Sequence, residues 1–203
     1  MIKGTMNTIK LPEPNHDSKI SVETALYKRR SIRDLKSTPL HLKEISMLLW
    51  AAQGVTALGG YRTTPSAGAM FPLEAYLVVG NVDDLAAGVY HYNPREHQIA
   101  KVDEHDRRAE LSEASLDQTW MQNGAVMIVL TGIKERTTAT FGNHWSSFVL
   151  MEAGHAAQNV YLQSFALGLG MTAVGSFDEK KVKSILKLKE GEAPLYLMPI
   201  GHK

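Results

Sequence analysis

The longest apolar run of the chain lies between residues 144 and 168 and carries a single carboxylate, Glu152. Apolar residues this dense, without a proline, predict a long helix that is buried on most of its sides. Polar side chains recur along it every three to four positions: Glu152, His155, Gln158, Asn159 and Gln163. Because five polar groups in hydrocarbon would be costly, we interpret the run as a core helix whose polar stripe faces a partner or a ligand.

Small residues mark the end of this helix. Glycine is the usual residue past a helix C-terminus, so Gly168 and Gly170 are expected to close it. Residues 171–177 then predict a short strand, broken at Gly175 and Ser176. A glycine at such a point allows backbone N–H groups to come close to a flat ligand.

The remaining apolar periodicities predict shorter elements. Ser21 is a candidate N-cap for a first helix, and Asp178 for a last one that ends at Leu186. Two further helices are expected over 40–52 and 103–114, the second charged and exposed, and strands over 75–79, 89–92, 98–102, 125–130 and 195–199. Helices come first and last with hairpin-like strands between them, which indicates an α+β fold. Residues 1–19 are expected to form an extended arm, and 20–203 a single domain.

Composition narrows the functional classes. A chain of 203 residues suits one domain with a substantial core. The net charge of +1 gives no indication of nucleic acid or of an anionic membrane surface as a partner. The absence of cysteine excludes disulfides, thiol catalysis and iron–sulfur clusters. Residues 1–14 lack the apolar core of a signal peptide, so we expect a cytoplasmic protein that acts on a small molecule.

Two segments carry candidate chemistry. Four cations and a hydroxyl follow the first helix within six positions: Lys28, Arg29, Arg30, Ser31 and Arg33. Guanidinium forks bind phosphate oxygens bidentately, so this cluster could hold a phosphate, although an ordinary solvated basic helix end has the same composition. Residues 61–72 form the second segment, in which two prolines bracket small residues. Such a shaped loop would leave room for a planar ring system, or would simply connect to the next strand.

Several familiar catalytic motifs are missing from the sequence. It contains no glycine-rich dinucleotide motif after a strand, no Walker A sequence and no G-x-S-x-G elbow, and its eight histidines lack the spacing of a zinc site. We therefore expect no metal ligands. An enzyme with neither nucleophile nor metal is a candidate for chemistry performed by a bound cofactor.

Four stretches together resemble the FMN-dependent nitroreductase family in order and spacing. They are R-R-S-I-R at 29–33, P-S-A-G at 65–68, G-H-A-A-Q-N at 154–159 leading to L-G-L-G at 167–170, and Y-L-M-P-I-G at 196–201. Within that family, R-T-T-P-S-A-G-A-M-F-P-L at 62–73 and G-V-Y-H-Y-N-P at 88–94 resemble the SagB-type dehydrogenase branch. The resemblance covers nearly the whole chain from about Lys10.

The resemblance implies a mostly antiparallel sheet flanked by helices, and a homodimer with two shared FMN sites at an interface that includes the long central helix. By position, Arg29, Arg30 and Ser31 would hold the phosphate and ribityl chain, Arg33 would lie near the pyrimidine edge, and Lys203 would be a second phosphate cation. Two further segments would complete the cofactor-binding set: Pro65, Ser66, Ala67 and Gly68 from the partner, and Ala173, Val174, Gly175 and Ser176. A backbone N–H of Gly175 or Ser176 would be directed at flavin N5.

The activity expected from this resemblance is ping-pong hydride and electron transfer from NAD(P)H to a small organic acceptor. Two alternatives stay open: a dehydrogenase that oxidises a peptide or heterocycle with O2 as the flavin oxidant, and a non-catalytic flavin-binding partner of a modification complex. The chain departs from the family at three points. It ends at Lys203 without a C-terminal extension, Gly175 stands where an acidic residue is frequent, and no match is found for the Lys-Tyr pair of azoline oxidases.

Overall fold

The computed structural model describes residues 8–203, and the first seven residues of the predicted arm lie outside the described part. The strands are β1 (Thr8–Lys10), β2 (Leu73–Val79), β3 (Gly88–Asn93), β4 (Gln98–Asp103), β5 (Val126–Ile133), β6 (Leu169–Met171) and β7 (Glu192–His202). The helices are α1 (Val22–Lys28), α2 (Leu42–Gln53), α3 (Arg108–Ala114), α4 (Glu135–Phe141), α5 (Trp145–Ala166) and α6 (Glu179–Leu186). Three short 3-10 turns lie at Ala67–Ala69, Thr119–Asn123 and Gly142–His144.

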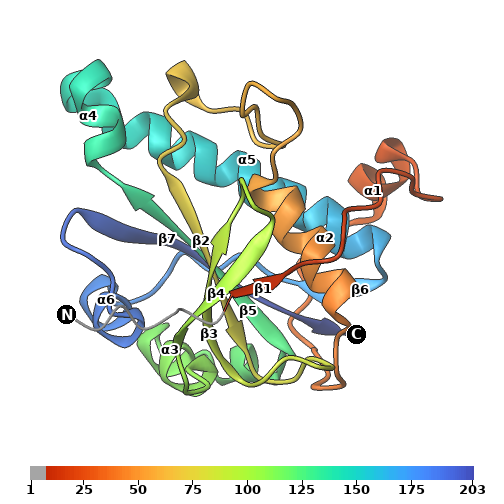
Figure 1. The fold of residues 1–203 in the computed structure, drawn as a ribbon. Helices are drawn as coiled ribbons and strands as arrows, with labels where there is room; N and C mark the ends of the chain where they lie inside the picture. Colours follow the sequence, from red (N-terminus) through yellow and green to blue (C-terminus); the bar gives the residue numbers. More distant parts are fainter. Residues whose placement is uncertain (1–7) are drawn as a thin grey trace.

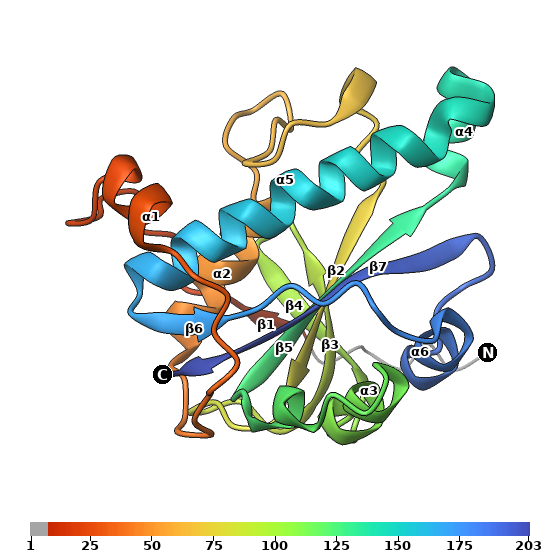
Figure 2. The same ribbon diagram turned by 180° about the vertical axis from the view of Figure 1, so that it is seen from behind.

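The strands form one sheet in the order β1-β4-β3-β2-β5-β7-β6, and every named pair is antiparallel. The α+β prediction is therefore confirmed. The sheet twists strongly, and α5 runs diagonally across one side of it with α2 beside it (Figure 1). Seen from behind, the segment after β6 crosses the opposite face toward α6, and α3 lies below it (Figure 2).

Two apolar layers hold the helices to the sheet. On one face Leu77, Ile128 and Leu130 pack with α2 and α5 residues such as Leu48 and Val160, all fully buried. On the other face Val78, Met127 and Val129 pack with residues of α3 and α6. Neighbouring residues of β2 and β5 thus enter opposite layers, because side chains alternate along a strand. This explains why both strands are apolar at nearly every position.

Within the expected extended arm, residues 8–10 form a strand that pairs with β4 at the edge of the sheet. Two predicted boundaries need correction. Within the predicted helix 103–114, only Arg108–Ala114 is helical, and Leu111 and Ala114 are buried against α6 and the sheet. The strand expected at 171–177 lies earlier, at Leu169–Met171, and beyond it only Val174 bridges to β7.

The glycines that follow α5 have different roles. Gly168 has a φ of +77° and follows the C-cap Leu167, as predicted for a residue that ends a helix. Gly170 instead lies inside β6 and pairs with Gly201. A Cβ at Gly170 would come within 2.9 Å of side-chain atoms of Ile32 and Leu35. Glycine at this position therefore allows the basic segment after α1 to pass closely over β6.

The polar residues of α5, expected to face a partner or a ligand, do not share one environment within the chain. Glu152 is 3% exposed. The side chain of Asn159 donates hydrogen bonds to the backbone of Thr63 and the hydroxyl of Thr64 in the same chain. His155 is exposed, and so are the apolar side chains of Leu150 and Met151. The part of the α5 surface that the rest of the chain leaves exposed is thus partly apolar.

Candidate functional site

A basic pocket lies where the end of α1 meets the C-terminal end of α5. Four cationic residues line it, namely Lys28, Arg29, Arg30 and Lys203, together with Tyr161, Ser164 and Phe165 of α5. The Arg29 guanidinium carbon lies 4.8 Å from the Tyr161 ring centre, and Lys203 Nζ lies 5.6 Å from that of Phe165. Two of the predicted phosphate ligands, Arg29 and Arg30, are thereby brought together with Lys203, from opposite ends of the chain.

A buried hydroxyl supports an anionic ligand here. The Oγ atom of Ser164 is buried and has no hydrogen-bond partner among the described residues. A buried polar group without a partner costs free energy, so such groups usually have a role or a ligand. With four cations around one free hydroxyl, the donors of the pocket suit a phosphate group.

Backbone hydrogen bonds hold the basic segment against the sheet. The N–H of Ile32 donates to the carbonyl of Met171 at 2.9 Å, and the N–H of Lys36 donates to the carbonyl of His202 at 2.7 Å. The hydroxyl of Thr172 donates to the carbonyl of Ile32 at 2.9 Å. These bonds place residues 29–33 beside 171–173, although the two segments are far apart in sequence.

The other predicted residues near the flavin ring lie along this junction. Ala173 is half-buried and Val174 is buried, whereas Gly175 and Ser176 are exposed. Within residues 8–203, neither backbone N–H of Gly175 and Ser176 donates a hydrogen bond, so both are free for a ligand. Arg33 is not part of the basic pocket: its guanidinium lies over the Trp120 ring, 5.6 Å from the ring centre.

The loop that contains Pro65, Ser66, Ala67 and Gly68 is held by α2 and by a hydrogen bond within the loop itself. The Thr64 hydroxyl donates to the carbonyl of Ala52 at 2.7 Å, and Ser66 Oγ accepts from the N–H of Phe71 at 2.9 Å. Gly68 has a φ of +60°, a conformation that residues with a Cβ rarely adopt. In both ribbon views this loop rises beside the N-terminal half of α5, while α1 lies near the C-terminal end (Figures 1 and 2).

A buried carboxyl lies behind this loop. Burial raises the pKa of Glu152 to about 7, while the Ser66 hydroxyl and the positive charge of Arg62 act in the opposite direction. One carboxyl oxygen, Oε1, is buried without a hydrogen-bond partner among the described residues. Arg62 is held by Gln53, which accepts a hydrogen bond from it, and by Phe71, whose ring centre lies 4.5 Å from the guanidinium carbon.

The basic pocket and the loop lie on opposite sides of α5 within one chain. Glu152 and Asn159 point toward the loop side, as their contacts show. Tyr161 follows Glu152 by nine positions, which places it about 180° around the helix at about 100° per residue. Ser164 lies about 18 Å farther along the axis than Glu152, at 1.5 Å per residue. The two predicted parts of the flavin site are therefore not brought together by a single chain.

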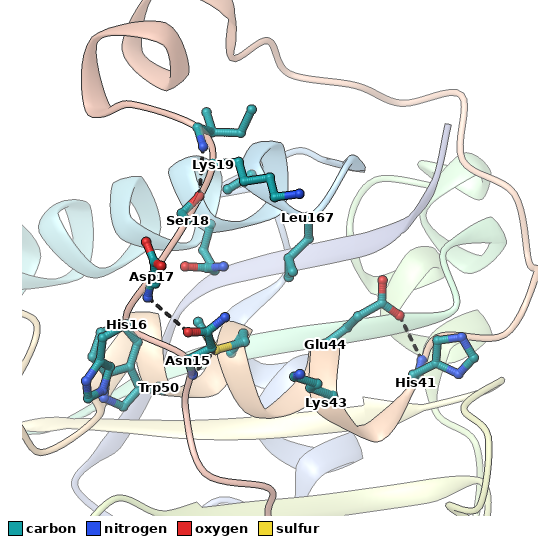
Figure 3. Close-up of a pocket in the computed structure, with 14 residues that line it drawn as sticks. Asn15, His16, Asp17, Ser18, Lys19, His41, Lys43, Glu44, Trp50 and Leu167 are labelled. Carbon is teal, nitrogen blue, oxygen red and sulfur yellow. Dashed lines mark hydrogen bonds between the residues drawn. The ribbon is translucent and has the colours of Figure 1, made fainter.

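A cavity much larger than the basic pocket lies elsewhere. It has a volume of about 810 Å³ and lies between residues 15–20, α2 and the end of α5. Figure 3 shows His16 beside Trp50, with ring centres 5.1 Å apart, Lys43 and Glu44 farther along the same helix α2, and Leu167 above them. At about 100° per residue, Gln163 of α5 points away from both Tyr161 and Phe165. Cavity size alone therefore does not identify the site.

Several residues of the site carry no signal in the sequence. Tyr161 and Ser164 read as ordinary helix residues, and Arg62 as part of a loop. A helical projection of 144–168 would have placed Tyr161 and Ser164 away from Glu152. Their relation to the basic segment depends on the pairing of β6 with β7, which no local pattern predicts.

Comparisons with known proteins agree with this architecture. The profile of the nitroreductase family matches residues 26–202. A protein of Methanocaldococcus jannaschii that carries the name of a nitroreductase is 42% identical over 200 residues, 98% of each chain. A crystal structure from Ralstonia eutropha, also named as a nitroreductase, superposes with a TM-score of 0.85 at 29% identity and covers 98% of this chain and 91% of that one.

A third relative is longer. The trifolitoxin-processing protein TfxB of Rhizobium leguminosarum is 32% identical over 162 residues, which are 73% of this chain and 43% of TfxB. The family match spans both the basic segment and the loop before β2. The chain therefore belongs to the nitroreductase family and is an oxidoreductase.

Proposed function

We propose that this protein is an FMN-dependent oxidoreductase that transfers electrons from NAD(P)H to a small organic acceptor in two half-reactions. When bound, FMN supplies the two-electron chemistry, and the protein supplies positioning and charge. The observation that carries the proposal is the basic pocket, in which Arg29, Arg30 and Lys203 surround the unpartnered hydroxyl of Ser164. These groups would hold the phosphate of FMN, and Ser31 would hold the ribityl chain.

The ring would extend from this pocket along the junction of residues 31–33 and 173–176. The free backbone N–H groups of Gly175 and Ser176 are donors for N5 of the ring, and Arg33 supplies a cation for the pyrimidine edge. No side chain in this set is required to form a covalent bond. That division of roles suits a site rich in cations and small residues.

A homodimer would complete each site. The loop with Pro65, Ser66, Ala67 and Gly68 lies on the far side of α5 from the basic pocket of its own chain, so it is available to a second chain. Exposed apolar side chains lie on both helices near this region: Val22, Leu26 and Tyr27 on α1, and Leu150 and Met151 on α5. Burying them between two chains would supply part of the apolar area that a stable dimer needs.

Reduction of the purified protein tests the redox assignment. The visible spectrum should show bound flavin, and anaerobic NADH or NADPH should bleach it rapidly. A colourless protein that takes up no FMN would contradict the assignment. A flavin spectrum that neither nucleotide bleaches would contradict NAD(P)H as the reductant and leave the two alternatives below.

A SagB-type dehydrogenase that oxidises a peptide or heterocycle, with O2 as the flavin oxidant, is the second candidate. The similarity to TfxB, named for trifolitoxin processing, favours it. A third possibility is a non-catalytic flavin-binding subunit of a modification complex. O2 consumption with a heterocycle-containing peptide separates these two, since only the dehydrogenase should consume O2 in proportion to substrate.

Subunit exchange tests the shared site. Gly68→Val should strain a residue at φ +60° and crowd Met70 and Phe141, whose atoms lie 3.4 Å from an added Cβ. Arg29→Ala should damage the phosphate end. A heterodimer of the two variants would have one doubly damaged site and one intact site, so FMN binding should return in up to half of its sites. No recovery after verified exchange would contradict the shared-site architecture.

Gly60→Ala is the matched control for the loop variant. Gly60 lies in the same connection, has a φ of +78° and has no atom within 4 Å of an added Cβ. Its substitution should add similar backbone strain, about 1 kcal/mol, without crowding a ligand. The variant to compare with it is Gly68→Ala, which adds the same single Cβ. FMN loss in Gly68→Ala but not in Gly60→Ala would therefore assign the effect to the flavin contact.

A further inference from the structure

A second polar cavity lies between the loop before β2, the ends of strands β2–β4 and α4. Its volume is about 580 Å³, within the range of small-molecule sites. Three arginines line it, together with one carboxylate and two neutral or weakly basic groups: Arg62, Arg95, Arg136, Glu74, His91 and Asn93. None of these residues belongs to the basic pocket described above.

The single carboxylate in this set is already paired. Glu74 forms an ion pair with Arg136, and its other oxygen lies 2.6 Å from Nε2 of His91. Arg136 is further fixed by a hydrogen bond of 2.9 Å to the carbonyl of Phe71. Burial favours the protonated form of Glu74, yet His91 and Arg136 outweigh it and lower the pKa of this carboxyl. Glu74 is therefore ionised and has its charge balanced by its own neighbours.

The other two arginines have no such partner. Neither Arg62 nor Arg95 forms an ion pair with a carboxylate within residues 8–203. Burial lowers the pKa of Arg62; the carboxyl groups of Glu74 and Glu152 act in the opposite direction, and the positive charges of Arg136 and Arg95 act with burial. Arg62 is thus a partly buried cation that has carboxyl groups nearby but forms no ion pair with either of them. A buried charge is costly unless it is paired, so this arrangement favours an added anion.

The guanidinium group of Arg62 is held in place without being neutralised, and the backbone of Arg95 is fixed beside it. Arg62 donates to Gln53 and lies over the Phe71 ring, which fixes its plane. Arg95 lies in the turn of the β3–β4 hairpin, where Asn93 Oδ1 accepts a hydrogen bond of 3.0 Å from its backbone N–H. Fixed cations bind an oxyanion with a smaller loss of conformational entropy than mobile ones.

We infer that this cavity binds the oxyanion group, a phosphate or a carboxylate, of a small molecule through the guanidinium groups of Arg62 and Arg95. Each guanidinium can donate two parallel hydrogen bonds to such a group. The Glu74–Arg136 pair forms a wall of the site and fixes the loop through Phe71. The inference rests on the cavity alone and does not depend on whether the protein binds FMN.

Calorimetric titration of the FMN-saturated protein with small anions tests the site. The ionic strength is kept constant, because salt screens the interaction between charges. Pyrophosphate represents a phosphate ligand and citrate a carboxylate ligand. We expect saturable binding of pyrophosphate or citrate. The anion that binds more tightly shows whether the site prefers a phosphate or a carboxylate group. Arg95→Gln should weaken that binding by about tenfold or more, as for the loss of a charge-assisted hydrogen bond. Arg95 is exposed, so this variant should fold normally.

Two further variants locate the binding. Lys180→Gln removes one positive charge from the exposed surface of α6 and should leave the dissociation constant unchanged within about twofold. Arg29→Ala damages the basic pocket; titrated with enough FMN to saturate its weakened site, it should bind the anion as tightly as the parent protein does. Loss of anion binding in Arg29→Ala with retention in Arg95→Gln would assign it to the basic pocket and overturn the inference. So would the absence of saturable binding of both anions by the parent protein.

Discussion

The hydroxyl groups of Ser31 and Tyr161, which are 130 positions apart in sequence, lie 2.9 Å apart. The Tyr161 oxygen also accepts a hydrogen bond of 2.9 Å from the backbone N–H of Ala173. One phenol on α5 therefore joins the basic segment to the residues after β6. These are the two segments along which we propose that the flavin lies. The ring of the same tyrosine also supports the guanidinium of Arg29.

Tyr161→Phe should weaken FMN binding while the fold is retained. The substitution keeps the ring beneath Arg29 but removes the partner of both Ser31 and the Ala173 N–H. An unpaired donor of this kind costs about 1–2 kcal/mol, or roughly five- to thirtyfold in affinity. Fluorescence titration of apoprotein with FMN measures the change. Tyr61→Phe, at an exposed tyrosine outside the proposed flavin and dimer contacts, is the control, and equal affinities for both variants would refute the role of Tyr161.

Arg29→Ala should weaken FMN retention by about 1.5–3 kcal/mol, the usual range for a hydrogen bond to a charged group. The side chain lines the basic pocket, and no carboxylate within residues 8–203 forms an ion pair with it, so its charge is available to a phosphate. The flavin content after prolonged dialysis gives the result. Stoichiometric yellow flavin in the dialysed variant would show that the phosphate is held elsewhere.

Glu152 should make the folded chain less stable as the pH rises. Its pKa is about 7 in the folded chain against an ordinary value of 4.5. The folded state therefore binds more protons between these values, and the free energy of unfolding falls as the pH increases through this window. Glu152→Gln keeps the shape without the charge. Above pH 7 it should be more stable than the parent by about 2–3 kcal/mol, with little difference below pH 4.5.

Urea unfolding at a series of pH values and one protein concentration measures this difference. The other carboxylates are common to the parent and to Glu152→Gln. The difference between their free energies of unfolding therefore reports the titration of Glu152. Glu179→Gln on α6 serves as the control, because Glu179 is exposed. A constant difference between parent and Glu152→Gln across the pH range would show that Glu152 does not carry a raised pKa.

Met151→Asp should dissociate the proposed dimer and reduce flavin binding with it. Met151 is 60% exposed on α5, and a charge there would be buried without a partner in an interface. Light scattering should show about twice the chain mass for the parent at low micromolar concentration, and the monomer mass for the variant. Leu116→Asp removes an apolar residue that is 72% exposed next to α3, and it should remain dimeric. Monomeric parent protein that binds FMN tightly would contradict the shared site.

Local pattern alone determined much of the architecture. The apolar density of 144–168 predicted α5 to within two residues at each end, because a long buried helix needs no distant partner to be recognised. The β-branched run at 125–130 predicted β5, and Ser21 and Asp178 both act as N-caps with side chains that accept from Thr24 and Lys181. The basic cluster at 28–33 likewise predicted a concentration of positive charge, and three of its residues line the basic pocket.

Tertiary structure decided the position of β6, the burial of Glu152 and the grouping of the arginines. These features depend on contacts between segments that are distant in sequence. Pairing with β7 places the strand at Leu169–Met171 instead of 171–177, and so brings Lys203 to Arg29. The loop at 62–66 covers one side of α5, which buries Glu152 and divides the polar stripe. The same long-range packing gathers Arg62, Arg95 and Arg136 around one cavity. Composition could count these arginines, but only the folded chain brings their charges close enough to interact.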